Sequence, residues 1–184
     1  MKTPLLYGAL IALVGALLTF GLYFAGYHDT PEKMKAMQWL PGVVGLIASI
    51  ICLALAMRER RVDFPADRTW GYGSALGTGV MTGLWAALFS AIVAFVYFVI
   101  VNPNFSETLH ELQIASLVDK GMSQSQIDAA APMMRKMSAP IPMTIMQTVF
   151  GFIWSVILAL IIAIFFRKPL RTAEVAVDAP PPLA

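Results

Sequence analysis

Four long apolar segments divide the chain, and none of them contains Asp, Glu, Lys, Arg or His. They run over residues 5–26, 39–57, 75–101 and 141–166. A bilayer core about 30 Å thick is crossed by roughly 20 apolar residues in a helix that rises about 1.5 Å per residue. Because backbone N–H and C=O groups in lipid must be paired within the segment, each segment is predicted to be a transmembrane helix.

Composition agrees with this pattern. The chain has 184 residues, of which 58% are hydrophobic and 13% charged, with a mean hydropathy of +0.72. A soluble domain carries about 25% charged residues. The predicted fold class is therefore all-α, a polytopic integral membrane protein with one membrane domain over residues 1–171. The Pro-rich tail, residues 172–184, is predicted to be disordered.

The first apolar segment is predicted to be a retained span and not a secretory signal peptide. Its apolar stretch exceeds the typical signal core of about 7–15 residues, and no convincing small-x-small cleavage site follows it. The net charge of +2 is small. Nucleic-acid-binding proteins carry many basic residues clustered on one exposed face, so no nucleic-acid partner is expected.

The distribution of Lys and Arg between the loops predicts the orientation, since cytoplasmic loops carry the excess. With both termini cytoplasmic, eight basic residues lie inside and five outside. The inner set is Lys2, Arg58, Arg60, Arg61, Arg68, Arg167, Lys168 and Arg171, and the outer set is Lys33, Lys35, Lys120, Arg135 and Lys136. We therefore expect a multi-pass membrane protein with both termini in the cytoplasm.

Small residues recur every fourth position in three of the spans, a spacing that lets helix backbones approach closely in lipid. We expect the third and fourth spans to meet along these rows, within one chain or across a dimer whose seam runs through Gly79 and Gly83. The rows are Ala75, Gly79, Gly83, Ala87 and Ala91 in the third span, Gly151, Ser155, Ala159 and Ala163 in the fourth, and Gly8, Ala12 and Ala16 in the first.

The connection over residues 102–140 is long for a small bundle, and its pattern predicts a helical hairpin on the outer side. Asn104 followed by Glu107 indicates a capping box for the first helix. Gly121 is a C-terminal stop. The hairpin is expected either to lie on the membrane surface or to cap the bundle.

A second capping box, Ser123 with Gln126, opens the second helix of the hairpin. Ile127, Ala130, Ala131, Met134 and Met137 form an apolar stripe along it. Pro132 interrupts this stripe. Because proline in a helix interior costs about 3 kcal/mol, a kink or a break is expected there.

These residues also carry a family resemblance, which extends from Pro4 to Lys168. The chain resembles the bacterial membrane-protein family catalogued as domain of unknown function 4199. The resemblance implies an inner-membrane protein and brings no known activity or site residues. The matching residues are Tyr72-Gly73-Ser74-Ala75-Leu76 with Gly79, Asn102-Pro103-Asn104-Phe105, Lys120-Gly121-Met122-Ser123 with Ile127, Met133-Met134 with Met137 and Pro140, and Arg167-Lys168.

Two groupings in the loop suggest metal chemistry, and both are better explained otherwise. Glu107 and His110 have the spacing of a di-iron ligand pair, but the second pair that such sites need is lacking. Thioethers suit Cu(I), yet methionine is also an adaptable apolar filler. The clustered methionines are Met122, Met133, Met134, Met137, Met143 and Met146. We expect no metal and no cofactor.

The spans lack the ionisable groups that transporters use near the midplane, and four helices alone are expected to enclose little room. Their most polar residues are Thr78, Thr82, Ser90, Thr144, Gln147, Thr148 and Ser155. The sequence therefore favours a non-enzymatic interaction, scaffold or regulatory protein that acts through its outer loop, with the bilayer and a homo-oligomer or membrane-protein partner as its contacts. The alternative is a small oligomeric channel or carrier with a pore lined by Thr82, Ser90 or Ser155.

Overall fold

The computed structural model describes residues 2–64 and 69–168. Every regular element in these ranges is helical: α1 (Lys2–Phe24), α2 (Pro31–Met37), α3 (Trp39–Val62), α4 (Tyr72–Val96), the π-helical turn η1 (Tyr97–Val101), α5 (Phe105–Asp119), α6 (Gln124–Met137) and α7 (Pro140–Phe165). Arg68, Arg171 and the tail 172–184 lie outside the described residues.

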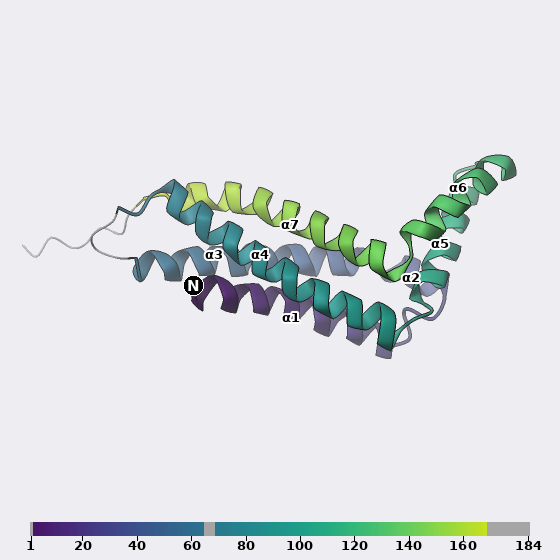
Figure 1. Cartoon of the computed structure of the whole chain (residues 1–184), viewed down its shortest axis with the longest axis horizontal. Helices are drawn as coiled ribbons and strands as arrows, with labels where there is room; N and C mark the ends of the chain where they lie inside the picture. Colours follow the sequence, from purple (N-terminus) through teal and green to yellow (C-terminus); the bar gives the residue numbers. More distant parts are fainter. Residues whose placement is uncertain (1, 65–68, 169–184) are drawn as a thin grey trace, which may run out of the picture.

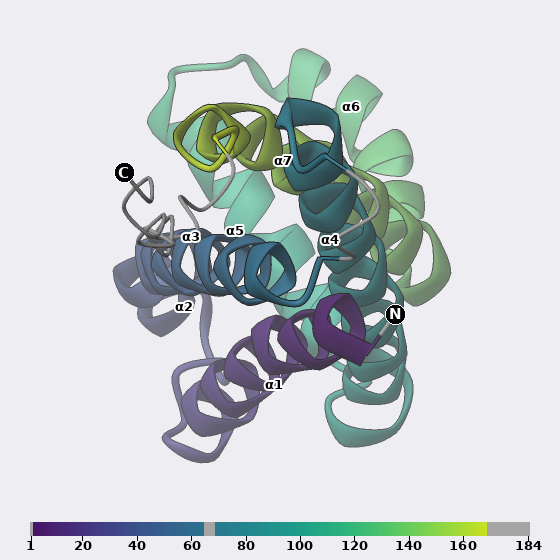
Figure 2. The same cartoon turned by 90° about the vertical axis from the view of Figure 1, so that its left-hand side faces the viewer.

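The long helices α1, α3, α4 and α7 run side by side with alternating direction (Figure 1). Seen end-on, α1 neighbours α3 and α4, and α7 completes the square (Figure 2). The described residues contain four candidate spans that are long and apolar enough to cross a membrane: Lys2–Phe24, Pro31–Val62, Tyr72–Val101 and Pro140–Phe165. The all-α, polytopic fold predicted from the apolar segments is confirmed.

The bundle is packed most tightly at the end that holds Lys2 and Arg167, called the basal end below. Leu53 and Met57 of α3, Ala75 of α4 and Ala159 of α7 are fully buried in one cluster there. The indole of Trp70 adds a hydrogen bond, since its Nε1 donates to the backbone carbonyl of Phe166 at 2.6 Å. The basal halves of α3, α4 and α7 are thereby joined.

An acidic side chain ties α1 to α3 at the same end. The Glu59 carboxylate accepts hydrogen bonds from the hydroxyls of Tyr7, at 2.9 Å, and Thr3, at 3.1 Å. Hydrogen bonds to a charged group are worth about 1.5–3 kcal/mol each when partly shielded from water. Glu59 therefore fixes the start of α1 against the end of α3.

At the opposite end, α2, α5 and α6 form a lobe beyond the long helices (Figure 1). Between α1 and α3, Thr30 and Pro31 begin the short helix α2, and the Thr30 hydroxyl accepts a hydrogen bond from the Lys33 N–H. Lys35 of α2 donates to the Asp119 carboxylate of α5 at 2.8 Å, which holds the pKa of that carboxyl below its usual range. The lobe is thus a three-helix unit and not only a hairpin.

The hairpin itself forms with one predicted cap and without the other. The Ser123 N–H donates to the Gln126 side chain at 3.0 Å, which confirms the second capping box, and Gly121 takes a φ of +75° after α5. The first capping box was wrong. Asn104 has a φ of −82° and a ψ of −6°, a helical conformation in which its side chain makes no cap bond, and Glu107 pairs instead with Arg135 at 3.6 Å.

Of the two alternatives expected at Pro132, a kink or a break, the break was wrong, because α6 runs through this residue to Met137. Pro132 is exposed, so its ring faces away from the rest of the chain. It follows three alanines, residues 129–131, which are the strongest helix formers. Local helix propensity therefore outweighs the one backbone hydrogen bond that proline removes.

Candidate functional site

A cavity of ≈ 510 Å³ lies between α1, α3, α4 and α7 at the depth of the apolar spans, and we call it the membrane cavity. A smaller space of ≈ 170 Å³ adjoins it and extends toward Tyr97 and Phe98. The two spaces share Gly15, Pro41, Gly45, Ser90 and Gln147 as lining residues. The expectation that four helices enclose little room was therefore wrong.

The cavity exists because the long helices meet at the basal end and separate toward the lobe. α4 and α7 lie together at the basal end and diverge toward the lobe (Figure 1). On the separated stretch, a Cβ atom added to Gly42, Gly45 or Gly151 would meet no atom within 4 Å. These glycines face open space, where a side chain would fit without a clash.

The glycines of the packed stretch behave in the opposite way. A Cβ on Gly79 would lie 2.7 Å from the Ala159 Cβ, and one on Gly83 would lie 2.8 Å from the Ser155 Cβ. Both distances are shorter than any side-chain contact tolerates. These positions let α4 and α7 approach to backbone distance, which in lipid stabilises the pair through van der Waals contact.

The structure therefore separates the seven residues predicted to pack helices. Gly79, Gly83 and Ala87 of α4 are buried, as are Ser155 and Ala159 of α7. Ala91 is half-buried. Gly151 is exposed and lines the membrane cavity, since α7 has left α4 at that level. Gly8 of α1 is also closely packed, because a Cβ atom added to it would lie 2.6 Å from the Trp85 Cβ.

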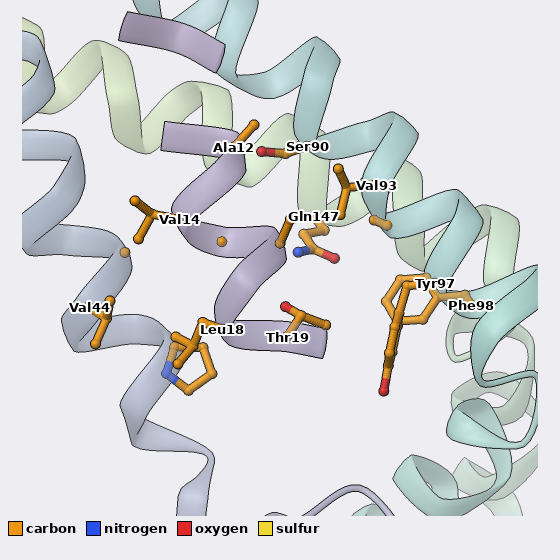
Figure 3. Close-up of a pocket in the computed structure, with 15 residues that line it drawn as sticks. Ala12, Val14, Leu18, Thr19, Val44, Ser90, Val93, Tyr97, Phe98 and Gln147 are labelled. Carbon is orange, nitrogen blue, oxygen red and sulfur yellow. The ribbon is translucent and has the colours of Figure 1, made fainter. Parts of the chain in front are cut away.

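The seven polar span residues considered above fall into two groups. Four are threonines whose hydroxyls are paired within their own helices, because each donates to the carbonyl four residues earlier at 2.7–2.9 Å (Thr78, Thr82, Thr144 and Thr148). The other three, Ser90, Gln147 and Ser155, line the membrane cavity, as do Thr148 and Ser49. The Ser90 hydroxyl and the Gln147 amide point into the adjoining space (Figure 3).

A polar and aromatic cluster closes the cavity at the lobe end. Tyr97 of η1 is 1% exposed, and its hydroxyl contacts the His28 Nδ1 and accepts from the Asn102 amide at 3.1 Å. The rings of His28 and Phe105 pack edge to face with centroids 5.3 Å apart. Burial lowers the pKa of His28, and the nearby Asp29 offsets part of that effect. His28 is therefore favoured in its neutral form.

Sequence reasoning missed this cluster and the α3 side of the cavity. His28 and Tyr97 are far apart in the chain, so no local pattern joins them. The only signal for the cavity was the run of small residues in the second span, where Gly42, Gly45 and Ser49 follow one another at spacings of three and four, directly after Pro41. Such residues more often indicate close helix packing than open space.

The residues considered for metal binding fall into two groups. In the part of the chain that the structure describes, no group of three or more His, Cys, Asp or Glu side chains lies close enough to hold an ion. Glu107 faces Arg135. Of the six clustered methionines, Met137, Met143 and Met146 line one space between the lobe and α7, whereas Met133 is 68% exposed on α6.

Comparison with known proteins agrees with the fold. Residues 6–168 match the family model described as Protein of unknown function (DUF4199), and the chain belongs to this family. No curated protein and no solved structure matches the chain.

Proposed function

We propose that this membrane protein is not an enzyme and acts by contact, with the lobe as its recognition surface for another membrane protein. The observation that carries the proposal is an apolar surface on a preformed lobe. Met133 is 68% exposed, Val118 57% and Met137 41%. Methionine at an exposed surface adapts to varied partners, and apolar side chains left exposed on an extramembrane element are a feature of interaction sites.

The lobe is held in place before any partner binds. The Lys35–Asp119 ion pair joins α2 to α5, the Glu107–Arg135 pair joins α5 to α6, and the Ser138 hydroxyl donates to Gln113 at 3.3 Å. A preformed surface loses little conformational entropy on binding. This supports recognition by α6 as a rigid element.

We place the lobe on the outer side of a bacterial inner membrane, with both termini in the cytoplasm. Lys2 and Arg167 lie at the basal end with Arg58, Arg60 and Arg61, opposite the lobe (Figure 1). The excess of basic residues at that end supports the orientation.

Crosslinking in intact membranes followed by mass spectrometry tests the recognition surface. The variant Met133→Ser with Met137→Ser removes apolar surface without touching the ion pairs of the lobe. The control Lys136→Ser changes an exposed polar residue of the same helix. We expect a partner that the wild type and the control both capture and the double variant loses. Identical crosslinks in all three proteins would exclude α6 as the recognition surface.

The membrane cavity favours a second candidate, a small carrier. Its volume of ≈ 510 Å³ lies within the range of about 300–1,000 Å³ that small-molecule sites occupy. Flux measurements on the reconstituted chain in liposomes distinguish the two functions. A carrier produces a flux of a small solute across the vesicle membrane, whereas a protein that acts by contact produces no flux of common ions or metabolites.

A further inference from the structure

We propose that the membrane cavity is a binding site for a neutral lipid, a molecule with an apolar chain and an uncharged hydrogen-bonding head that enters between α3 and α7. This inference does not rest on recognition by the lobe. It follows from the walls of the cavity, its polar atoms, its open side and its size.

The walls are apolar and carry no charge. Small and aliphatic side chains from α1, α3, α4 and α7 make up most of the lining, and no Asp, Glu, Lys, Arg or His is among its residues. An ion without a partner at hydrocarbon depth is strongly disfavoured. The lining therefore selects a ligand without a formal charge.

The polar atoms gather where the two spaces join. Ser90 and Gln147 line both spaces, and their polar atoms point inward (Figure 3). A primary amide in a lipid environment costs several kcal/mol unless it is hydrogen-bonded. The Gln147 amide both donates and accepts, so it matches a hydroxyl, ester or ketone group on the ligand, whose apolar chain then fills the larger space.

The cavity is open toward the bilayer. Pro41 and Gly42 of α3 and Gly151 and Trp154 of α7 line it and are exposed on the outside of the bundle, and the Trp154 side chain is 52% exposed. All four residues belong to the candidate spans. A molecule already dissolved in the membrane can thus enter sideways, without crossing the lobe.

The size of the cavity fits a lipid chain. The membrane cavity has ≈ 510 Å³ and the adjoining space ≈ 170 Å³. Small-molecule sites have volumes of about 300–1,000 Å³. A flexible chain can therefore occupy the larger space and extend into the smaller one.

Photolabelling of the full chain in nanodiscs tests the proposal. The probe is a diacylglycerol with a diazirine in one acyl chain, and the charged comparison is a phosphatidylglycerol with the same labelled chain. We expect the diacylglycerol to label peptides that line the cavity, such as those containing Gly45 and Gln147, in preference to the phosphatidylglycerol. Equal labelling by both probes overturns the selection of a neutral ligand.

Two kinds of variant locate the site. Gly45→Leu and Gly151→Leu place side chains in the open space, where an added Cβ meets no atom within 4 Å, so the helices need not move. Gln147→Leu keeps the volume and removes the hydrogen bond. We expect the first pair to abolish cavity labelling and Gln147→Leu to weaken it by about two- to tenfold, as one hydrogen bond implies.

The matched control is Gly21→Leu, a glycine of α1 that also has no atom within 4 Å of an added Cβ and lies outside the cavity. Its labelling should equal that of the wild type. Size-exclusion elution and helix content show that each variant is folded. The proposal fails if folded Gly45→Leu and Gly151→Leu are labelled like the control, or if the cavity peptides of the wild type stay unlabelled.

Discussion

The Tyr97 hydroxyl and the Nδ1 atom of His28 are in hydrogen-bond contact although 69 positions separate them in the chain. Tyr97 lies on the π-helical turn that ends the third span, and His28 lies in the loop after the first. π-helical turns often occur at functional positions. Here the turn places the tyrosine beneath the lobe, where it joins the loop, the span and Asn102.

Replacing Tyr97 with Phe removes one hydroxyl and leaves the His28 ring and the buried Asn102 amide without this partner. An unpaired buried polar group costs about 1–3 kcal/mol, so the free energy of unfolding should fall by about that amount. Thermal unfolding of the purified chain in detergent measures the change. Tyr72→Phe is the control, since its exposed hydroxyl donates to the Leu160 carbonyl at 3.2 Å and should matter less.

Stability should depend on pH through His28. Burial lowers its pKa in the folded protein relative to the unfolded value of about 6.5. The unfolded chain therefore binds more protons in this range, and the free energy of unfolding falls as the pH drops from about 6.5 toward the folded pKa. The melting temperature should be lower at pH 5 than at pH 8.

His28→Gln should flatten that pH dependence, whereas His110→Gln, a change in the other histidine of the chain, should leave it in place. If the melting temperature of His28→Gln falls between pH 8 and pH 5 as steeply as that of the wild type, another group is responsible. Asp119, whose carboxyl pKa is lowered by Lys35, would then be the next group to test.

Gly83→Ile should destabilise the fold within one chain. Its Cβ would lie 2.8 Å from the Ser155 Cβ, and such overpacking costs about 1–3 kcal/mol. Gly77→Ile, where an added Cβ meets nothing within 4 Å, is the control. The melting temperature should fall for Gly83→Ile alone, with the oligomeric state unchanged. A change of oligomeric state at constant stability would instead favour a dimer seam through Gly83.

Cysteine labelling in whole cells tests the orientation. In a Cys52→Ala background, Ala129→Cys places an exposed thiol in the lobe and Asp63→Cys one at the basal end. A membrane-impermeant maleimide should label Ala129→Cys in intact cells and Asp63→Cys only after permeabilisation. Labelling of both in intact cells, or of Asp63→Cys alone, would contradict the proposed topology.

The elements of the fold follow from short stretches of the chain. The spans were predicted from uncharged apolar segments, and the hairpin was predicted from Gly121 and the cap at Ser123. Errors arose where two local signals competed. Asn104 resembles a cap but lies in helical backbone, and Pro132 resembles a break but follows three alanines.

The candidate site could not be predicted from short stretches of the chain in the same way. Gly83 and Gly151 carry the same signal in the sequence, a small residue in a four-residue row. One abuts Ser155, and the other faces the membrane cavity. The difference depends on the divergence of α4 and α7, to which residues along the whole length of both helices contribute.

The amino-acid sequence alone determined that this chain crosses the membrane four times, because the cost of placing charge and unpaired backbone in lipid acts on each segment separately. Only the tertiary structure decided where the helices touch and where they enclose space. Inside lipid, apolar surface drives no association, so helix positions depend on the fit of many small contacts. The cavity and the His28–Tyr97 contact are consequences of that fit.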